Sequence, residues 1–179
     1  MGTIVGIRCR DGVVIAGDRL LVRSGRVESR NRQHVYDLDV GVGVAVVGSD
    51  VDRFADRLES ELRSYRLDRG AVSLAAVERL AGEIADETGH EAVVAARDDD
   101  DRATVRGVYT DGATLADPPM AFGSGASLAL GGLEAADLAS LPLSGTESFV
   151  RELFESVAER DPGTGTEVDF WTLADAPDA

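Results

Sequence analysis

The chain has 179 residues, of which 33 are acidic and 18 are basic, so its formal net charge is −15. All 18 basic residues are arginines, and the sequence contains no lysine. The missing lysine excludes mechanisms that need a lysine amine, such as Schiff-base chemistry and phosphate-loop binding. The acidic balance argues against nucleic acid and against an anionic membrane surface as partners.

The length suits one domain of ordinary size, which needs neither disulfides nor metals to hold its core. The single cysteine, Cys9, cannot form an intrachain disulfide and therefore favours a reducing compartment. Arg8 and Arg10 interrupt the first apolar run, so no secretory signal is expected, and no segment is long enough to span a membrane. These features predict a soluble, cytoplasmic protein. The high acidity with arginine in place of lysine predicts a halophilic origin, where salt screens self-repulsion, and a GC-rich genome with chance acidity is the alternative.

The first part of the chain favours β-strands, because β-branched residues alternate with turn signals such as Asp-Gly and Ser-Gly. The expected strands cover residues 3–9, 13–17, 22–27, 35–38 and 40–47. The strand over 40–47 is almost wholly apolar, which is typical of a strand covered on both faces.

Four helices are expected, over residues 51–65, 74–84, 124–139 and 149–157. The first two carry apolar side chains at spacings of three and four, which indicates an amphipathic helix. We expect Ser49 or Asp50 to cap the first helix and Ser73 the second, while Gly70 and Gly89 end them.

Three more strands are expected over residues 92–96, 103–109 and 167–173, and the acidic run 98–101 between the first two is typical of a solvated turn. The order is therefore strands, two helices, strands, two helices and a strand, which is not a regular βαβ alternation. It predicts an α+β fold, a four-layer αββα sandwich with two antiparallel sheets between helix pairs. We expect a single domain over 1–173 and an acidic tail over 174–179.

The first 18 residues resemble the amino terminus of a mature proteasome β subunit, and equally that of the bacterial HslV-type peptidase. They read Gly-Thr-Ile-Val-Gly-Ile and then Asp-Gly-Val-Val-Ile-Ala-Gly-Asp. The resemblance continues in Val46-Val47-Gly48, in Gly123-Ser124-Gly125 and in the run from Arg160 to Gly165. Order and spacing match over nearly the whole chain, so it is identified as a member of the amino-terminal-nucleophile hydrolases. The resemblance implies the same αββα fold.

The resemblance also implies a chemistry in which an amino-terminal threonine hydroxyl attacks the peptide carbonyl and the free amine acts as base. In this family an aspartate and a lysine tune the nucleophile, and a glycine amide forms the oxyanion hole. A serine and a second aspartate orient the amine. The positions that match these retained groups are Asp18, Gly48, Ser124, Asp161 and, as a later hydroxyl, Thr164.

Two positions depart from the family pattern. Counted back from Asp18, the nucleophile position falls on Gly2, which has no hydroxyl, and the lysine position falls on His34. Histidine does not replace a cationic lysine at neutral pH without a partner, because its unperturbed pKa is about 6.5. The sequence therefore predicts a degenerate active site.

Thr3 is the alternative nucleophile, since Gly2-Thr3 imitates the junction at which the family's precursors are cut. A shift of one residue along a strand points the side chain to the opposite face, so Thr3 would need a bulge in the first strand to reach the same place. Removal of Met1 would leave Gly2, not Thr3, as the first residue.

Each retained residue also has a structural interpretation. Asp18 suits a hydrogen-bonded strand end, Ser124 a helix cap, and Asp161 a turn. Gly48 would allow close approach between a strand and a helix, and His34 would be an ordinary satisfied histidine. His90, beside Gly89, is expected to have no role.

Three functions follow. The first is a proteasome-β-like pseudoenzyme, a structural or regulatory subunit of a homo-oligomeric ring or of a ring shared with active relatives. The second is an active threonine-type peptidase of a proteasome-like or HslV-like compartment that uses Thr3. The third is a metal or small-molecule binding module built from Asp18, His34, Asp161 and the terminal amine. For the first two functions we expect neither cofactor nor metal, and an ATP-driven unfoldase is a conceivable partner.

Overall fold

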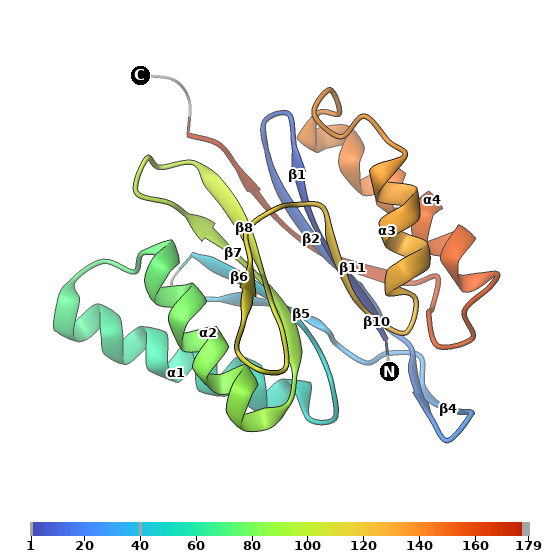
Figure 1. Ribbon diagram of the computed structural model, residues 1–179, viewed down its shortest axis with the longest axis horizontal. Helices are drawn as coiled ribbons and strands as arrows, with labels where there is room; N and C mark the ends of the chain where they lie inside the picture. Colours follow the sequence, from blue (N-terminus) through green and yellow to red (C-terminus); the bar gives the residue numbers. More distant parts are fainter. Residues whose placement is uncertain (1, 40, 177–179) are drawn as a thin grey trace.

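The computed structural model describes residues 2–39 and 41–176. Within them, strands form a four-stranded sheet in the order β10-β1-β2-β11 and a five-stranded sheet in the order β5-β6-β7-β8-β9. All pairs are antiparallel. Strands β3 and β4 pair only with each other, as a separate hairpin (Figure 1).

The four-stranded sheet consists of β1 (Thr3–Cys9), β2 (Gly12–Asp18), β10 (Met120–Gly123) and β11 (Val168–Ala174). The five-stranded sheet consists of β5 (Val35–Leu38), β6 (Val42–Val47), β7 (Glu91–Arg97), β8 (Ala103–Val108) and β9 (Thr114–Leu115). The separate hairpin consists of β3 (Leu21–Arg23) and β4 (Arg26–Ser29).

The two sheets face each other across a shared apolar layer, and the alternation of side chains along the strands explains why both faces are buried. Along β6, Ala45 and Val47 pack between the sheets, while Val44 and Val46 point outward to a helix layer. Along β1, Ile4 lies between the sheets and Val5 on the other side. An apolar side chain buried in this way contributes about 1.5–3 kcal/mol.

Each sheet is covered by one pair of helices (Figure 1). The helices are α1 (Val51–Arg69), α2 (Leu74–Thr88), α3 (Ala126–Glu134) and α4 (Leu143–Ala158). Helices α1 and α2 pack on the five-stranded sheet, and α3 and α4 on the four-stranded sheet. The predicted four-layer αββα sandwich is therefore confirmed.

The first two helices begin and end as their capping residues predict. Asp50 accepts a hydrogen bond from the amide of Arg53, and Ser73 accepts one from the amide of Ala76. Gly70 and Gly89 are the C-caps, both with positive φ.

The third helix was predicted too long, at 124–139, and the strands β9 and β10 were not predicted. Helix α3 contains Gly131 and Gly132, which weaken helix propensity, and it ends at Glu134 without a glycine cap. Strand β10 is only four residues long and is defined by its pairing with β1, for example Thr3 with Gly123, rather than by a local pattern.

The carboxyl end is fixed to the body beyond β11. Asp175 receives two hydrogen bonds from the Arg8 guanidinium, at 2.8 and 2.6 Å, and one from the amide of Ala103. Val40, assigned to the strand 40–47, and residues 177–179 of the predicted tail lie outside the described residues. None of the helices that the structure describes is long and apolar enough to cross a bilayer.

Candidate active site

The start of β1 places Gly2 and Thr3 on opposite faces of the four-stranded sheet. Thr3 pairs with Gly123 and Ile4 pairs with Gly17, without a register shift. No bulge therefore brings the Thr3 side chain to the side on which a side chain at position 2 would point. The two residues belong to two different groups of polar side chains.

On the Gly2 side lie Asp18, at the end of β2, and His34, just before β5. A Cβ atom added to Gly2 would stand 2.4 Å from Asp18 Oδ1 and 2.5 Å from His34 Cε1. Real Cβ atoms do not come this close to other heavy atoms. The His34 ring and the Asp18 carboxyl therefore occupy the space that a side chain at position 2 would need.

The imidazole of His34 is buried, with 2 % of the residue exposed. Its Nδ1 lies 2.6 Å from the backbone carbonyl oxygen of Asp18 and 3.8 Å from Asp18 Oδ1. Because a carbonyl oxygen only accepts hydrogen bonds, Nδ1 carries a proton and donates it to this oxygen. The ring is thus held in place by the backbone of β2.

The carboxyl group of Asp18 is fully buried and is tied to backbone amides. Its Oδ1 accepts from the amide of Thr3 at 2.8 Å, and its Oδ2 accepts from the amides of Gly165 at 2.6 Å and Leu20 at 3.3 Å. Burial raises the pKa of Asp18, and these hydrogen bonds together with the nearby His34 oppose that rise. Asp18 therefore anchors the start of β1 to the loop before β11.

On the other side, the Thr3 hydroxyl is fully buried at the start of a chain of hydrogen bonds. It accepts from the amide of Gly125 at 2.9 Å and lies 2.7 Å from the hydroxyl oxygen of Thr164. Thr164 donates to Asp161 Oδ2 at 2.5 Å, so the Thr3 hydroxyl donates to Thr164. Thr3 is therefore connected through Thr164 to a carboxylate.

Asp161 also accepts a hydrogen bond from the hydroxyl of Ser124. Ser124 Oγ donates to its Oδ2 at 2.7 Å, and the amide of Gly163 donates to its Oδ1 at 3.1 Å. Burial acts to raise the pKa of Asp161, but the hydrogen bonds from Thr164, Ser124 and Gly163 outweigh it and lower the pKa. Asp161 thus stays ionised as the acceptor at the end of the network.

Gly48, just after β6, packs on His90. Its φ is +150°, and a Cβ added to it would lie 2.3 Å from His90 Cδ2. His90 is 4 % exposed, and its Nε2 accepts a hydrogen bond from the amide of Asp50 at 3.3 Å. His90 therefore supports the turn after β6, a role that was not expected from its sequence neighbourhood.

The structure brings seven of the eight predicted site residues into two adjacent groups. These are Gly2, Asp18 and His34 on one side, and Thr3, Ser124, Asp161 and Thr164 on the other. The interpretation of Ser124 as a helix cap was wrong, because the N-cap of α3 is Gly125 and the Ser124 hydroxyl donates to Asp161 instead.

Sequence reasoning missed the backbone amides of Gly125 and Gly165, which bind Thr3 and Asp18. Both glycines lie in the Gly-Ser-Gly and Gly-Thr-Gly segments that carried the resemblance, so the signal was present. In the ligand set of the third hypothesis, Asp161 accepts hydrogen bonds from Ser124 and Thr164. The described residues contain no cluster of three or more potential metal ligands.

Comparison with known proteins agrees with this geometry. The family model described as "Proteasome subunit" matches residues 1–173. The chain belongs to the proteasome subunit family. It is 29 % identical to "Proteasome subunit beta 1" of Desulfurococcus amylolyticus, over 94 % of this chain and 87 % of that protein. It is 31 % identical to "Proteasome subunit beta 2" of Haloterrigena turkmenica, over 93 % of this chain and 73 % of that protein.

A third relative, "Proteasome subunit beta" of Halobacterium salinarum, is 30 % identical over 91 % of this chain and 70 % of that protein. The predicted resemblance to proteasome β subunits is thus confirmed.

Proposed function

We propose that this chain is a proteasome β-type subunit without peptidase activity, which acts as a structural or regulatory member of a ring. The observation that carries the proposal is the Gly2 side of the site. Gly2 supplies no hydroxyl, and the His34 ring together with Asp18 fills the space that a side chain at this position would need. A nucleophile can neither be present there nor be accommodated without moving these two groups.

Thr3 is a poor substitute for the missing nucleophile in this arrangement. Its side chain is fully buried, and its hydroxyl already donates to Thr164 and accepts from the amide of Gly125. In the uncut chain its own nitrogen is a peptide amide that donates to Asp18, and only cleavage between Gly2 and Thr3 would turn it into an amine. An amide nitrogen has no free lone pair with which to act as the base that the family's reaction requires.

The retained fold supports a role in assembly. The αββα sandwich is complete, and the hydrogen bonds of Asp18 and Asp161 join segments that lie far apart in the sequence. A ring built from copies of this chain, or from this chain and related subunits, is the assembly we propose, because subunits of this kind close into cyclic symmetry.

Salt is expected to control this assembly. Each chain carries a net charge of −15, so neighbouring copies repel one another unless the charge is screened. Two of the relatives described above come from Haloterrigena and Halobacterium, which agrees with a salt-rich cytoplasm. We expect the ring to loosen or dissociate below about 1 M salt, where screening weakens.

The decisive experiment measures hydrolysis of fluorogenic peptides by the purified chain in roughly molar salt, together with the intact mass of the chain. We expect no hydrolysis and a chain that begins at Met1 or Gly2. The variants Thr3→Val and Thr172→Val are assayed in parallel, Thr172 being an exposed threonine of β11. Hydrolysis that disappears in Thr3→Val but persists in Thr172→Val, from a chain beginning at Thr3, would establish an active threonine peptidase and overturn the proposal.

A further inference from the structure

The residues around the β3–β4 hairpin form the most basic stretch of this acidic chain. Residues 19–32, which we name the basic hairpin, contain five arginines and a single acidic residue, Glu28. The arginines are Arg19, Arg23, Arg26, Arg30 and Arg32. A local charge of +4 in a chain of −15 marks this segment as distinct from the rest of the surface.

The basic hairpin projects from the body of the molecule near the start of the chain (Figure 1). Neither main sheet pairs with it, and Val27 on β4 is 50 % exposed. Arg26 and Arg30 are exposed and form no ion pair with any residue that the structure describes. The hairpin therefore presents two unpaired cations beside an exposed apolar side chain.

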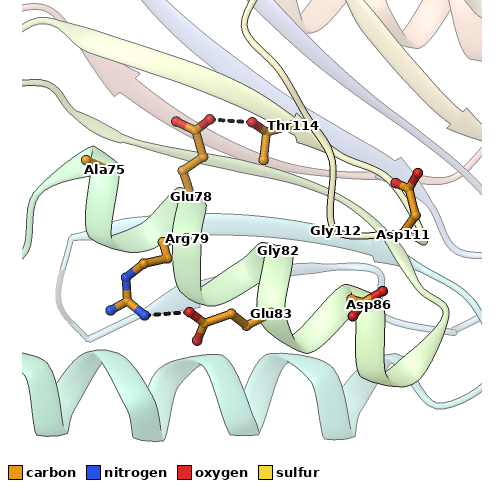
Figure 2. A pocket seen from close by; sticks show the side chains of 9 residues that line it. All are labelled: Ala75, Glu78, Arg79, Gly82, Glu83, Asp86, Asp111, Gly112 and Thr114. Atoms are coloured by element: carbon orange, nitrogen blue, oxygen red, sulfur yellow. Dashed lines mark hydrogen bonds and ion pairs between the residues drawn. The ribbon is translucent and has the colours of Figure 1, made fainter.

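A groove of opposite charge lies between α2 and the turn that joins β8 to β9 (Figure 2). We name it the acidic groove; its volume is about 510 Å³, and four carboxylates and one arginine line it. The lining residues are Ala75, Glu78, Arg79, Gly82, Glu83, Asp86, Asp111, Gly112 and Thr114.

Two of the four carboxylates are already engaged within the chain. Glu83 pairs with Arg79 at 2.7 Å, and Glu78 accepts from Arg106 at 3.2 Å. Asp86 and Asp111, at the other end of the groove in Figure 2, have no cationic partner in residues 2–39 and 41–176. The groove thus offers two unpaired anions.

The middle of the groove is formed by backbone rather than by side chains. A Cβ added to Gly82 would lie 2.8 Å from the carbonyl oxygen of Gly112, so the helix and the turn approach closely there. Gly82, Gly112 and Ala75 therefore add no large side chain to the lining, and the charge of the groove comes from the carboxylates and Arg79.

The basic hairpin and the acidic groove lie in different parts of the molecule, the hairpin near the start of β1 and the groove on the α2 side (Figure 1). We propose that the basic hairpin of one copy docks in the acidic groove of the next copy, with Arg26 and Arg30 facing Asp86 and Asp111. Two different surfaces then form each contact, and such a head-to-tail contact generates a ring when its rotation closes. This inference rests on the proposed role as a ring subunit and names the contact that would build the ring.

The contact is compatible with assembly in high salt. At about 1 M ionic strength the Debye length is roughly 3 Å, so long-range repulsion between chains of −15 is removed while ion pairs in direct contact keep part of their attraction. Paired charges of opposite sign also fix which surfaces meet, because a shifted docking would place like charges together.

The proposed contact is tested by reversing the charges on the basic hairpin, on the acidic groove and on both. The variant Arg26→Glu/Arg30→Glu reverses the hairpin, Asp86→Arg/Asp111→Arg reverses the groove, and a fourfold variant carries both changes. Arg66→Glu/Arg69→Glu is the control matched to the hairpin reversal, because these exposed arginines on the last turn of α1 line neither surface and lower the net charge by the same amount. Light scattering in about 1 M salt gives the mass of each assembly, and circular dichroism confirms that each variant is folded.

We expect each double reversal to weaken assembly by about tenfold or more, the fourfold variant to recover it, and the control to assemble like the unaltered chain. If the unaltered chain assembles and the reversals leave its mass unchanged, or if the fourfold variant is not restored, this contact is wrong while the ring role stands. A chain that remains monomeric in high salt would overturn the ring role and the contact together.

Discussion

The polar groups on the two sides of the first strand, around Thr3 and around Gly2, differ in kind. On the Thr3 side, hydroxyls and a carboxylate form a continuous network from Thr3 through Thr164 to Asp161. On the Gly2 side the nearest groups are the Asp18 carboxyl and the buried His34 ring, which stands against the glycine. Residues that are neighbours in sequence thus belong to environments with opposite properties, because successive residues of a strand point to opposite faces.

On both sides the polar groups are engaged in hydrogen bonds within the chain. The Thr3 network is fully bonded, but its hydroxyl is buried and its nitrogen is an amide. The Gly2 side has the aspartate that the family's chemistry expects, but this carboxyl is used to bind backbone amides. Both sides therefore act first as supports for the start of β1, and four substitutions measure how much each contributes.

Asp18→Ala should have the largest effect, because the amides of Thr3, Leu20 and Gly165 would lose their acceptor in a buried site. We expect a loss of about 3–5 kcal/mol in the free energy of unfolding, measured by urea denaturation in high salt. Asp18→Asn should lose less, since one oxygen remains. Asp99→Ala, in the exposed turn between β7 and β8, is the control, and a loss at position 18 no larger than this control would contradict the anchoring role.

Gly2→Thr should destabilise the chain next most strongly, by about 1–3 kcal/mol, because the new side chain overlaps Asp18 and His34. Combining it with His34→Ala should recover part of the loss, which a double-mutant cycle of unfolding free energies would detect. If the free-energy changes of the two substitutions are additive, His34 does not exclude a side chain at position 2.

Thr3→Val should cost about 1–2 kcal/mol, because it removes the acceptor of the buried Gly125 amide and the donor to Thr164 at nearly constant volume. Thr3→Ser keeps the hydroxyl and should recover most of this loss. Thermal unfolding is measured for both variants and for the control Thr172→Val, on the exposed face of β11. The control shows how much of the stability change comes from replacing threonine by valine and how much from losing the buried hydrogen bonds. Equal stability of all three variants would mean that the network adds nothing.

Asp161→Asn should have the smallest effect, and the effect should depend on pH. The folded chain holds the pKa of Asp161 below its usual value, so its contribution is present above the unfolded pKa of about 3.9 and is lost as pH falls through the folded pKa. Urea unfolding at several pH values should show unaltered chain and variant converging in acid. For the exposed Asp99→Asn we expect a difference in unfolding free energy that does not change with pH. The same result for Asp161→Asn would show that the ionised Asp161 carboxylate does not stabilise the fold.

Local patterns predicted much of the fold. The spacing of Phe54, Leu58 and Leu62 and the caps at Asp50 and Gly70 predicted α1 closely, because helix periodicity and capping are properties of neighbouring residues. The four-residue strand β10 was missed, since its existence depends on pairing with β1 more than a hundred residues earlier in the chain. Ser124 was taken for a cap because its partner Asp161 is distant in sequence.

The sequence by itself determined the order of the four helices and of most strands, the family, and the absence of a hydroxyl at position 2 and of any lysine. These follow from residue identity and from short spacings, which need no knowledge of long-range contacts. Only the tertiary structure decided that His34 and Asp18 fill the side-chain space of Gly2 and that Thr3 faces Thr164. These contacts join segments from 16 to 161 residues apart, and the packing of whole layers, not local preference, brings such segments together.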